Sequence, residues 1–308
     1  MGVTMFNKAK ARFVQNIFII FTMFFFLIPF SKIYSKVSLG LKDKIIEIPI
    51  YIIDAFTDKR FSGNPAAVCP LLEWLEDDVL QSIASENNLS ETAFFVKDKD
   101  IYNLRWFTPE VEVDLCGHAT LASAYVIFKH LNYEYSEIVF ETKSGRLTVK
   151  KEKDILYMDF PVIDTSPVEI PEKLIQSLGA KPKEVLQGSW LYLAVFENES
   201  EIKTLNPDFS IMKKLEKDVV VTAKGNKSAD FVSRCFAPSV GIPEDPVTGS
   251  SHCALVLYWS RKLKKTHFHA LQLSKRGGEL YCEYLGDRVI IGGKAVTFSI
   301  GRITLEKE

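Results

Sequence analysis

The chain has 308 residues, of which 47% are hydrophobic and 25% are charged, which is the balance of a globular protein long enough for two domains. Its formal net charge is −1 at pH 7, so no overall basic field favours nucleic acid as a partner. Its five cysteines are scattered without a CxxC pair, a spacing that fits neither a disulfide framework nor a zinc site.

The N-terminal segment differs from the rest of the chain. Residues 13–30 are almost entirely apolar and have lysines or arginine on both sides. This pattern resembles a signal peptide or a single membrane anchor. A third interpretation is a start codon assigned upstream of a soluble domain that begins near Ile48. All three interpretations stay open, so residues 1–45 are placed outside the fold, and membrane contact is expected only through residues 13–30.

The first half of the folded region is predicted to contain strands, two helices and a meander. Runs of apolar and β-branched residues predict strands at 48–54, 66–71, 92–96 and 104–107. The spacing of apolar residues predicts helices over 75–87 and 117–131. Short runs separated by turn residues predict the meander, with strands at 138–140, 147–151 and 155–160.

The second half is predicted to repeat this plan after a proline-rich boundary at 164–171, which divides the chain into domains 46–165 and 166–308. Its predicted elements are a helix at 172–178, strands at 191–196, 219–223 and 231–236, a helix at 250–262, and strands at 270–274, 279–284, 289–292 and 295–305. The helices at 117–131 and 250–262 are apolar nearly all round, so both are expected to be buried. The predicted class is α+β, with an antiparallel sheet wrapped around each central helix.

One sequence pattern occurs twice, at residues 104–128 and 231–259. Each copy has a strand-like run that ends in Phe-x-Pro, then a loop with an aspartate (Asp114 or Asp245), then a helix start made of small residues. A helix that starts this way presents bare N–H groups and the positive end of its dipole, which attract carboxylates. The repeat therefore predicts two half-sites that face each other across a cleft.

Three side chains near these helix starts are candidates for chemistry. Glu91, in NLSETAFF, precedes an apolar run, so it is expected to be partly desolvated and suited to proton transfer; the alternative is a solvated or capping glutamate. His118 can bind substrate or stabilise developing negative charge, or it can cap its helix. Asp245, between two prolines, can orient His118 or accept a substrate ammonium, or it can form an Asx-turn.

Backbone amides at the helix starts are the expected carboxylate donors, and such preorganised donors are often the largest electrostatic contribution in a site. They belong to Gly117, His118, Gly249, Ser250 and Ser251. Cys116 stands at a helix start, a position that lowers a thiol pKa, but the sequence identifies no partner for it.

Four motifs in the same order resemble the PhzF-like (phenazine biosynthesis-like) family, whose members share the fold of diaminopimelate epimerase. The motifs are DAFTDKRFSGNPAAV, NLSETAFF, DLCGHATLASA and PEDPVTGSSHCA, and the resemblance covers about residues 48–305. It implies two similar domains, each an antiparallel barrel-like sheet around a central helix, with a site in the cleft between them. In this family the C-terminal strand often returns to the first domain.

The resemblance also implies an activity, which is cofactor-independent isomerisation of a small carboxylic acid, with no metal and no organic cofactor. It implies that Glu91 shuttles a proton, that His118 and Asp245 line the site, and that the helix start at Gly249, Ser250 and Ser251 binds the substrate carboxylate. A cytoplasmic homodimer with a biosynthetic role is expected on the same basis. The epimerase relatives use one cysteine from each half, and only Cys116 falls near such a position, so single-base transfer by Glu91 is expected instead.

Two other functions remain as alternatives. The first is a metal-dependent hydrolase with the ligands Asp114, His118, Asp245 and His252, although Pro246 and the lack of an acidic base beside a His-x-x-x-His pair argue against it. The second is a non-catalytic protein that binds small acids or acts as a scaffold on the same fold. Members of the family differ widely in substrate, so the resemblance does not identify the substrate.

Overall fold

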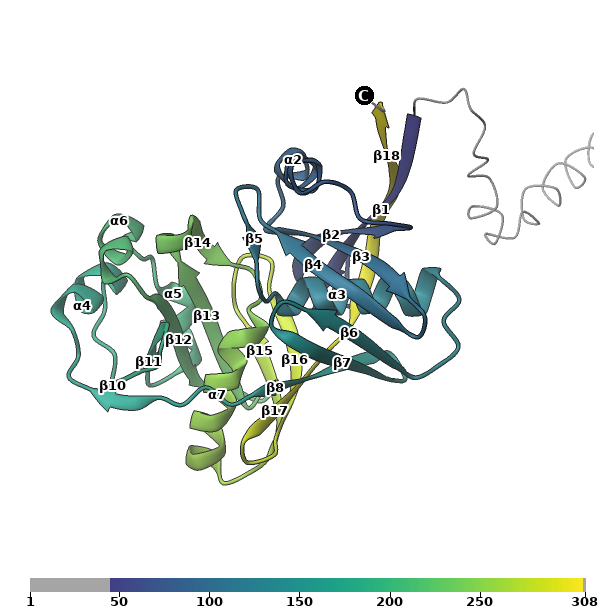
Figure 1. The fold of residues 1–308 in the computed structure, drawn as a ribbon. Helices are drawn as coiled ribbons and strands as arrows, with labels where there is room; N and C mark the ends of the chain where they lie inside the picture. The colour runs from purple at the N-terminus through teal and green to yellow at the C-terminus, as the bar shows by residue number, and fades with distance from the viewer. Residues whose placement is uncertain (1–44, 307–308) are drawn as a thin grey trace, which may run out of the picture. The chain divides into compact units, whose positions relative to one another are not determined.

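The computed structural model describes residues 45–306, and Ile46–Leu305 form one compact unit. The strands of this unit join in one hydrogen-bonded network, with two helices, α3 (Gly117–His130) and α7 (Gly249–Leu263), at the centres of two similar halves (Figure 1). Both helices are buried along most of their length because they are apolar on nearly every side. The predicted α+β class with two pseudo-repeated halves is confirmed.

The first half contains the following elements in chain order: β1 (Ile45–Ala55), β2 (Asn64–Leu71), α2 (Asp77–Asn87), β3 (Glu91–Asp98), β4 (Ile101–Phe107), β5 (Glu112–Val113), α3, β6 (Glu137–Thr142), β7 (Gly145–Glu152), β8 (Ile155–Pro161) and β9 (Ser166–Val168). The second half contains α4 (Glu172–Leu178), β10 (Glu184–Gln187), β11 (Leu191–Val195), α5 (Glu199–Thr204), α6 (Phe209–Met212), η3 (Lys213–Leu215), β12 (Asp218–Lys224), β13 (Phe231–Ala237), η4 (Pro238–Val240), β14 (Ile242–Asp245), α7, β15 (His267–Gln272), β16 (Gly278–Tyr284), β17 (Arg288–Gly293) and β18 (Ala295–Glu306).

The two halves repeat the same strand order and direction. In the first half β2 is parallel to β3, β3 is antiparallel to β4, and β4 is parallel to β6, which starts the antiparallel meander β6–β7–β8. In the second half β11, β12, β13 and β15 follow the same pattern, and β15–β16–β17 form the corresponding meander. The sequence repeat around the two central helices therefore extends through most of each half.

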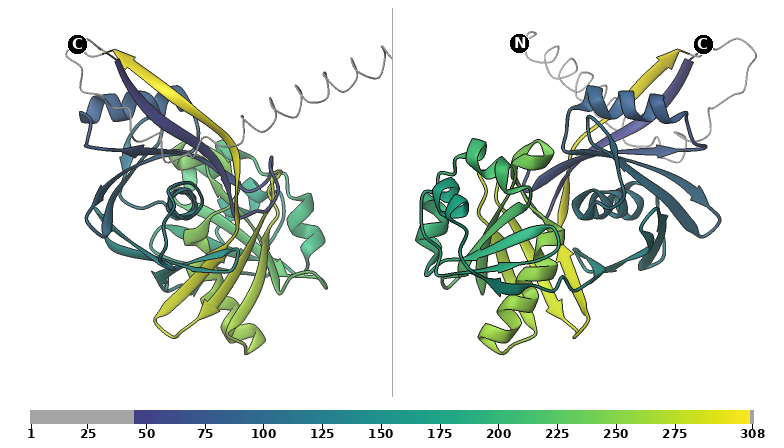
Figure 2. Two further views of the ribbon diagram at one scale, coloured as in Figure 1. Left: turned by 90° about the vertical axis from the view of Figure 1, so that its right-hand side faces the viewer. Right: turned by 60° about the vertical axis from the view of Figure 1, so that its left-hand side comes forward.

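Strands at the end of each half pair with the other half. β9 pairs with β10, the first strand of the second half, and β18 pairs with β1, the first strand of the first half. The β1–β18 pair is the purple and yellow ribbon seen in Figures 1 and 2. β8 and β17 also pair directly with each other. Backbone ladders therefore join the halves at three places, which restricts their relative movement.

Alternating side chains give each sheet one side that faces a central helix. On β3, Ala93 and Phe95 belong to the core around α3 and α7, whereas Phe94 packs with α2. On β12, Val220 belongs to that same central core, whereas Val219 and Val221 pack with the outer helices. This is the two-residue alternation of a strand that is covered on both faces.

The helices α5 and α6 lie outside the predictions because six and four residues carry too little periodicity to be recognised. The sequence did contain their N-cap signals. The Asn198 side chain accepts from the Glu201 amide, and the Asp208 side chain accepts from the amides of Ser210 and Ile211.

Gly293, at the end of β17, leaves room for the buried ring of Phe56. A Cβ atom on residue 293 would lie 2.4 Å from Phe56 Cδ1. We expect Gly293→Ala to lower the free energy of unfolding by about 1–3 kcal/mol, because neither the ring nor the strand can move freely. The control is Gly301→Ala on β18, where the new Cβ would make an ordinary 3.5 Å contact with Ile50. Equal urea-unfolding free energies for the two variants would contradict this account.

Within residues 45–306, no helix is long and apolar enough to cross a lipid bilayer. The apolar segment 13–30, on which the anchor and signal-peptide interpretations rest, lies outside the described residues.

Candidate active site

The N-termini of the two central helices meet. Gly117 is the first residue of α3 and Gly249 is the first residue of α7, and a Cβ on Gly117 would lie 3.8 Å from the Cα of Gly249. Neither helix has a side-chain hydrogen bond at its N-cap. The first amides of both helices, including those of Ser250 and Ser251, therefore have no capping side chain, and they can donate to a carboxylate.

Glu91 and His118 lie in contact beside these helix tips. Glu91 is the first residue of β3 and His118 is the second residue of α3, and Glu91 Oε2 lies 3.1 Å from His118 Nε2. The side chains are 13% and 7% exposed, so the pair is largely desolvated. The contact is an ion pair without an aligned hydrogen bond, and neither atom has another partner within residues 45–306. Catalytic contacts are often poorly aligned until a substrate binds.

Cys116 lies on the other side of the same imidazole. It is the N-cap residue of α3, and its Sγ lies 3.5 Å from His118 Nδ1. Burial raises the pKa of this thiol, and the Glu91 carboxylate raises it further. The prediction that the helix start would lower this pKa is therefore wrong, because desolvation outweighs the helix dipole.

The protonated form of His118 is favoured by its neighbours. Burial acts to lower the pKa of the imidazole, but the Glu91 carboxylate and the hydrogen bond with Cys116 raise that pKa well above its usual value. His118 is therefore expected to be an imidazolium near neutral pH. In this form it can stabilise negative charge that develops on a bound substrate.

A raised histidine pKa predicts the pH dependence of stability. The stabilisation is complete below the unfolded pKa near 6.5 and is lost as pH rises through the higher folded pKa. We expect His118→Gln to lower the free energy of unfolding by about 1–3 kcal/mol near pH 6, and by less as the pH rises and the imidazolium loses its proton. The control is His267→Gln, since the His267–Glu283 pair is at the surface. A loss that is the same at every pH would contradict this assignment.

Glu91, Cys116 and His118 also form a group that could hold a metal ion, since their ligand atoms lie within 4.8 Å of one another. However, the two ring nitrogens of His118 face different partners, Nδ1 facing Cys116 and Nε2 facing Glu91. An ion would bind through one ring nitrogen only, whereas both nitrogens of His118 already have a partner, so the imidazole is placed to act as a charged group between Glu91 and Cys116.

The ligand set proposed for a hydrolase is not brought together. Asp114 is exposed, and its backbone carbonyl accepts from the Ser144 hydroxyl. His252 is fully buried, with Nδ1 lying 2.8 Å from the carbonyl of Thr248. Neither residue belongs to a metal-binding group within the described part of the chain. The prediction of these ligands is therefore wrong, because the first loop directs Asp114 to solvent and α7 buries His252.

Asp245, at the end of β14, is held from both halves of the molecule. Its Oδ1 accepts from Asn64 Nδ2 at 2.8 Å, and its Oδ2 accepts from the hydroxyl of Thr248. Burial raises the pKa of Asp245 to about 6, although the charge of His118 acts in the opposite direction. Sequence reasoning missed Asn64, a fully buried residue of the first half that also donates to the Val247 carbonyl at 3.0 Å.

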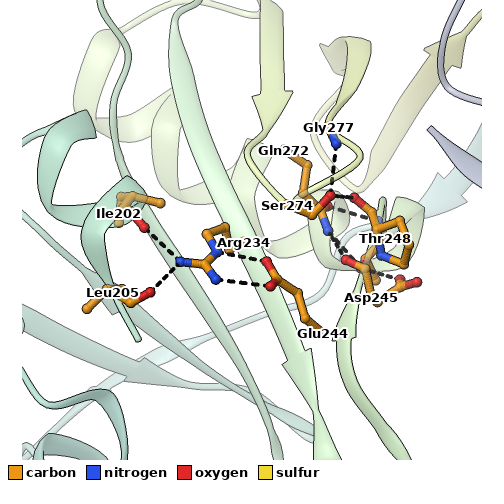
Figure 3. Close-up of polar contacts among 10 residues, drawn as sticks. Ile202, Leu205, Arg234, Glu244, Asp245, Thr248, Gln272, Ser274 and Gly277 are labelled. Atoms are coloured by element: carbon orange, nitrogen blue, oxygen red, sulfur yellow. Dashed lines mark hydrogen bonds and ion pairs between the residues drawn. The ribbon is translucent and has the colours of Figure 1, made fainter. Parts of the chain in front are cut away.

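Side chains from β15 and the following loop fix the segment between Asp245 and α7 (Figure 3). Gln272 accepts from the Thr248 amide at 2.9 Å and donates to the Asp245 carbonyl at 2.8 Å. The Ser274 hydroxyl donates to the Pro246 carbonyl at 2.8 Å and accepts from the Gly277 amide at 3.0 Å. The Thr248 hydroxyl donates to Asp245 and accepts from Gln272 Nε2 at 3.3 Å, so it does not cap α7.

An arginine–glutamate pair supports the approach to each helix start. Arg234 on β13 forms a two-pronged ion pair with Glu244 and also donates to the carbonyls of Ile202 and Leu205 (Figure 3). Arg105 on β4 forms the corresponding pair with Glu112. Each arginine stands two residues before the phenylalanine of Phe-x-Pro, so the sequence repeat already indicated that the two arginines have equivalent positions.

A pocket lies away from these residues. It has a volume of about 770 Å³, and residues such as Lys150, Asp159, His269 and Glu283 line it, where the two meanders adjoin. None of the predicted site residues lines this pocket. The chemistry is therefore assigned to the helix tips, where buried ionisable groups and uncapped amides occur together.

Three comparisons place the chain among known proteins. Residues 53–301 match the PhzC-PhzF family model, described as phenazine biosynthesis-like protein. An uncharacterized isomerase of Pseudomonas aeruginosa is 49% identical over 261 residues, which cover 84% of this chain and 100% of that protein. A crystal structure of a PhzF-family phenazine biosynthesis protein from Enterococcus faecalis is 46% identical, with a TM-score of 0.82 and coverage of 84% of this chain and 100% of that one.

A more distant likeness shows the fold alone. A hydroxyproline epimerase from Agrobacterium vitis, with bound trans-4-hydroxy-L-proline, has a TM-score of 0.53 at 10% identity and covers 84% of this chain and 93% of that one. The family-model match and the 49% identity are decisive. This chain belongs to the phenazine biosynthesis-like (PhzC-PhzF) family.

Proposed function

We propose that this protein is an isomerase that moves a proton between carbon atoms of a small carboxylic acid, with Glu91 as the acid and base. The observation that carries the proposal is the desolvated Glu91–His118 pair beside two facing helix N-termini without side-chain caps. The relatives named as isomerases support the same class of reaction.

Each group has one task in this mechanism. The amides of Gly117, Gly249, Ser250 and Ser251 bind the substrate carboxylate at the positive ends of α3 and α7. The Glu91 carboxylate takes a proton from a carbon near that carboxylate and returns it to another position. The His118 imidazolium stabilises the negative charge that develops between these two steps.

Asp245 and Cys116 complete the site. Asp245 is held by Asn64 and Thr248, so its carboxylate has a fixed orientation toward the His118 charge. Cys116 stays a thiol and packs against the imidazole, where it orients the ring. No step in this scheme requires a metal or an organic cofactor.

The test is solvent deuterium incorporation into a panel of small hydroxy and amino acids, followed by NMR. We expect deuterium at a carbon position of at least one acid with the wild-type protein, and no incorporation with Glu91→Gln. Tight binding of an acid without any proton exchange would instead favour a binding or scaffold role.

A further inference from the structure

The internal repeat places a second carboxyl residue at the position that Glu91 occupies in the first half. Glu91 is the first residue of β3, and Asp218 is the first residue of β12. In each strand, the residue that follows the carboxyl residue pairs with the phenylalanine of a Phe-x-Pro motif. Thr92 pairs with Phe107, and Val219 pairs with Phe236. Asp218 is therefore the structural counterpart of Glu91.

Strand alternation directs Asp218 toward α7. It lies on the same side of β12 as Val220, which belongs to the central core, and Thr222, which accepts from Trp259 Nε1 of α7 at 3.0 Å. The start of α7 lies at the same end of β12. Val220 pairs with Cys235, Cys235 pairs with Asp245, and the Asp245 carboxylate accepts from the Thr248 hydroxyl, next to the first residue of α7.

The distances along the two elements place Asp218 at the helix tip. Trp259 lies ten residues after Gly249, about 15 Å along the helix at the usual rise. Thr222 lies four residues after Asp218, about 13 Å along the strand. Asp218 is therefore level with the first turn of α7, as Glu91 is with the first turn of α3.

Asp218 has no cation to balance it. Its side chain is half-buried and makes no hydrogen bond or ion pair within residues 45–306. Burial raises its pKa to about 6, and the nearby carboxylate of Asp245 contributes to the rise. Glu91 has the His118 imidazolium as its partner, whereas the corresponding position beside Asp218 is Ser250, the second residue of α7.

We infer that Asp218 is a substrate-contacting residue which, together with Asp245, receives the positively charged group of the substrate. This inference rests on the proposed function, in which the helix tips bind the carboxylate. The substrate is then a small zwitterionic acid with an ammonium group, as in an amino acid. An ammonium donates three hydrogen bonds and relieves the repulsion between two carboxylates, whereas a hydroxyl in its place does not relieve that repulsion.

The experiment compares matched ligands with the full-length protein. Dissociation constants are measured by calorimetry for a panel of small amino acids and for the 2-hydroxy acids of the same carbon skeletons. We expect at least one amino acid to bind about tenfold or more tightly than its hydroxy counterpart at pH 8. The preference is expected to fall as pH drops through about 6, where Asp218 and Asp245 take up protons.

Asp218→Asn is expected to remove this preference, and Asp218→Glu is expected to restore part of it. Glu216→Gln is the matched control, because Glu216 is an exposed carboxyl residue two positions earlier, and its loss should leave the preference unchanged. Unfolding midpoints show that each variant is folded. The inference is overturned if no amino acid in the panel is preferred by the wild type, or if the preference survives in Asp218→Asn.

Calorimetry measures binding and deuterium exchange measures proton transfer, so the role of Asp218 and the role of Glu91 can be refuted independently. The Glu91→Gln protein should lose deuterium exchange but keep the ammonium preference. Exchange without any preference would leave the Glu91 role intact and remove the role of Asp218. If the wild type preferred amino acids in binding but exchanged no deuterium, the role of Asp218 would stand and the role of Glu91 would be removed.

Discussion

The Glu91→Gln protein is expected to turn over its substrate about two to four orders of magnitude more slowly than the wild type, which is the usual contribution of a general acid and base. Glutamine keeps the shape of the side chain but cannot accept a proton from carbon. Because the uncapped helix tips that bind the carboxylate are unchanged, the dissociation constant of the substrate should stay within a few-fold. The measurements are kcat and a separate binding titration of the same acid.

The matched control for this variant is Glu86→Gln, which removes an exposed carboxylate from α2, the helix that precedes β3. Its kcat should equal that of the wild type. A Glu91→Gln protein with full activity would remove Glu91 from the mechanism. A variant that lost binding and turnover equally would indicate that Glu91 only holds the substrate.

Replacement of Arg234 by leucine is expected to lower the free energy of unfolding by about 3 kcal/mol or more. The Arg234 side chain is 11% exposed, and its removal leaves the Glu244 carboxylate, which is 21% exposed, without its cation. The carbonyls of Ile202 and Leu205 also lose a donor. Breaking one side of a desolvated pair costs more than the pair contributes, because the remaining charge stays partly buried. Urea unfolding measures this change.

Arg302→Leu is the control for Arg234→Leu, because Arg302 forms an ion pair with Glu47 in which both side chains are 56% exposed. It should change the stability by less than about 1 kcal/mol. A double variant in which leucine replaces both Arg234 and Glu244 should regain part of the loss. If the double variant is as unstable as Arg234→Leu, the buried charge of Glu244 is not the cause.

The central helices could be predicted from the sequence because their signals are local and strong. The runs at 117–131 and 250–262 are apolar on nearly every side and begin with small residues, and the structure has helices at Gly117–His130 and Gly249–Leu263. The Phe-x-Pro repeat also predicted that two helix starts would face each other, and a Cβ on Gly117 would be only 3.8 Å from Gly249. A repeated pattern constrains a fold more than a single segment can.

Most contacts that cross between the halves could not be predicted from local patterns. Asn64 and Asp245 are 181 residues apart, and no local pattern indicates that the amide of one holds the carboxylate of the other. The pairing of β9 with β10 likewise had no local signal, whereas the pairing of β18 with β1 agrees with the strand return that the family resemblance implied. The raised pKa of Cys116 also needed the structure, because burial and the Glu91 charge outweigh the local helix dipole. A homodimer and a cytoplasmic location stay predictions.

The most direct test of the mechanism is a crystal structure of the Glu91→Gln protein with an acid that the wild type labels with deuterium. We predict that the carboxylate lies within hydrogen-bond distance of the first amides of α3 and α7, with the labelled carbon beside residue 91. An acid that binds instead in the pocket near Lys150 and His269, or with its labelled carbon far from residue 91, would contradict the account.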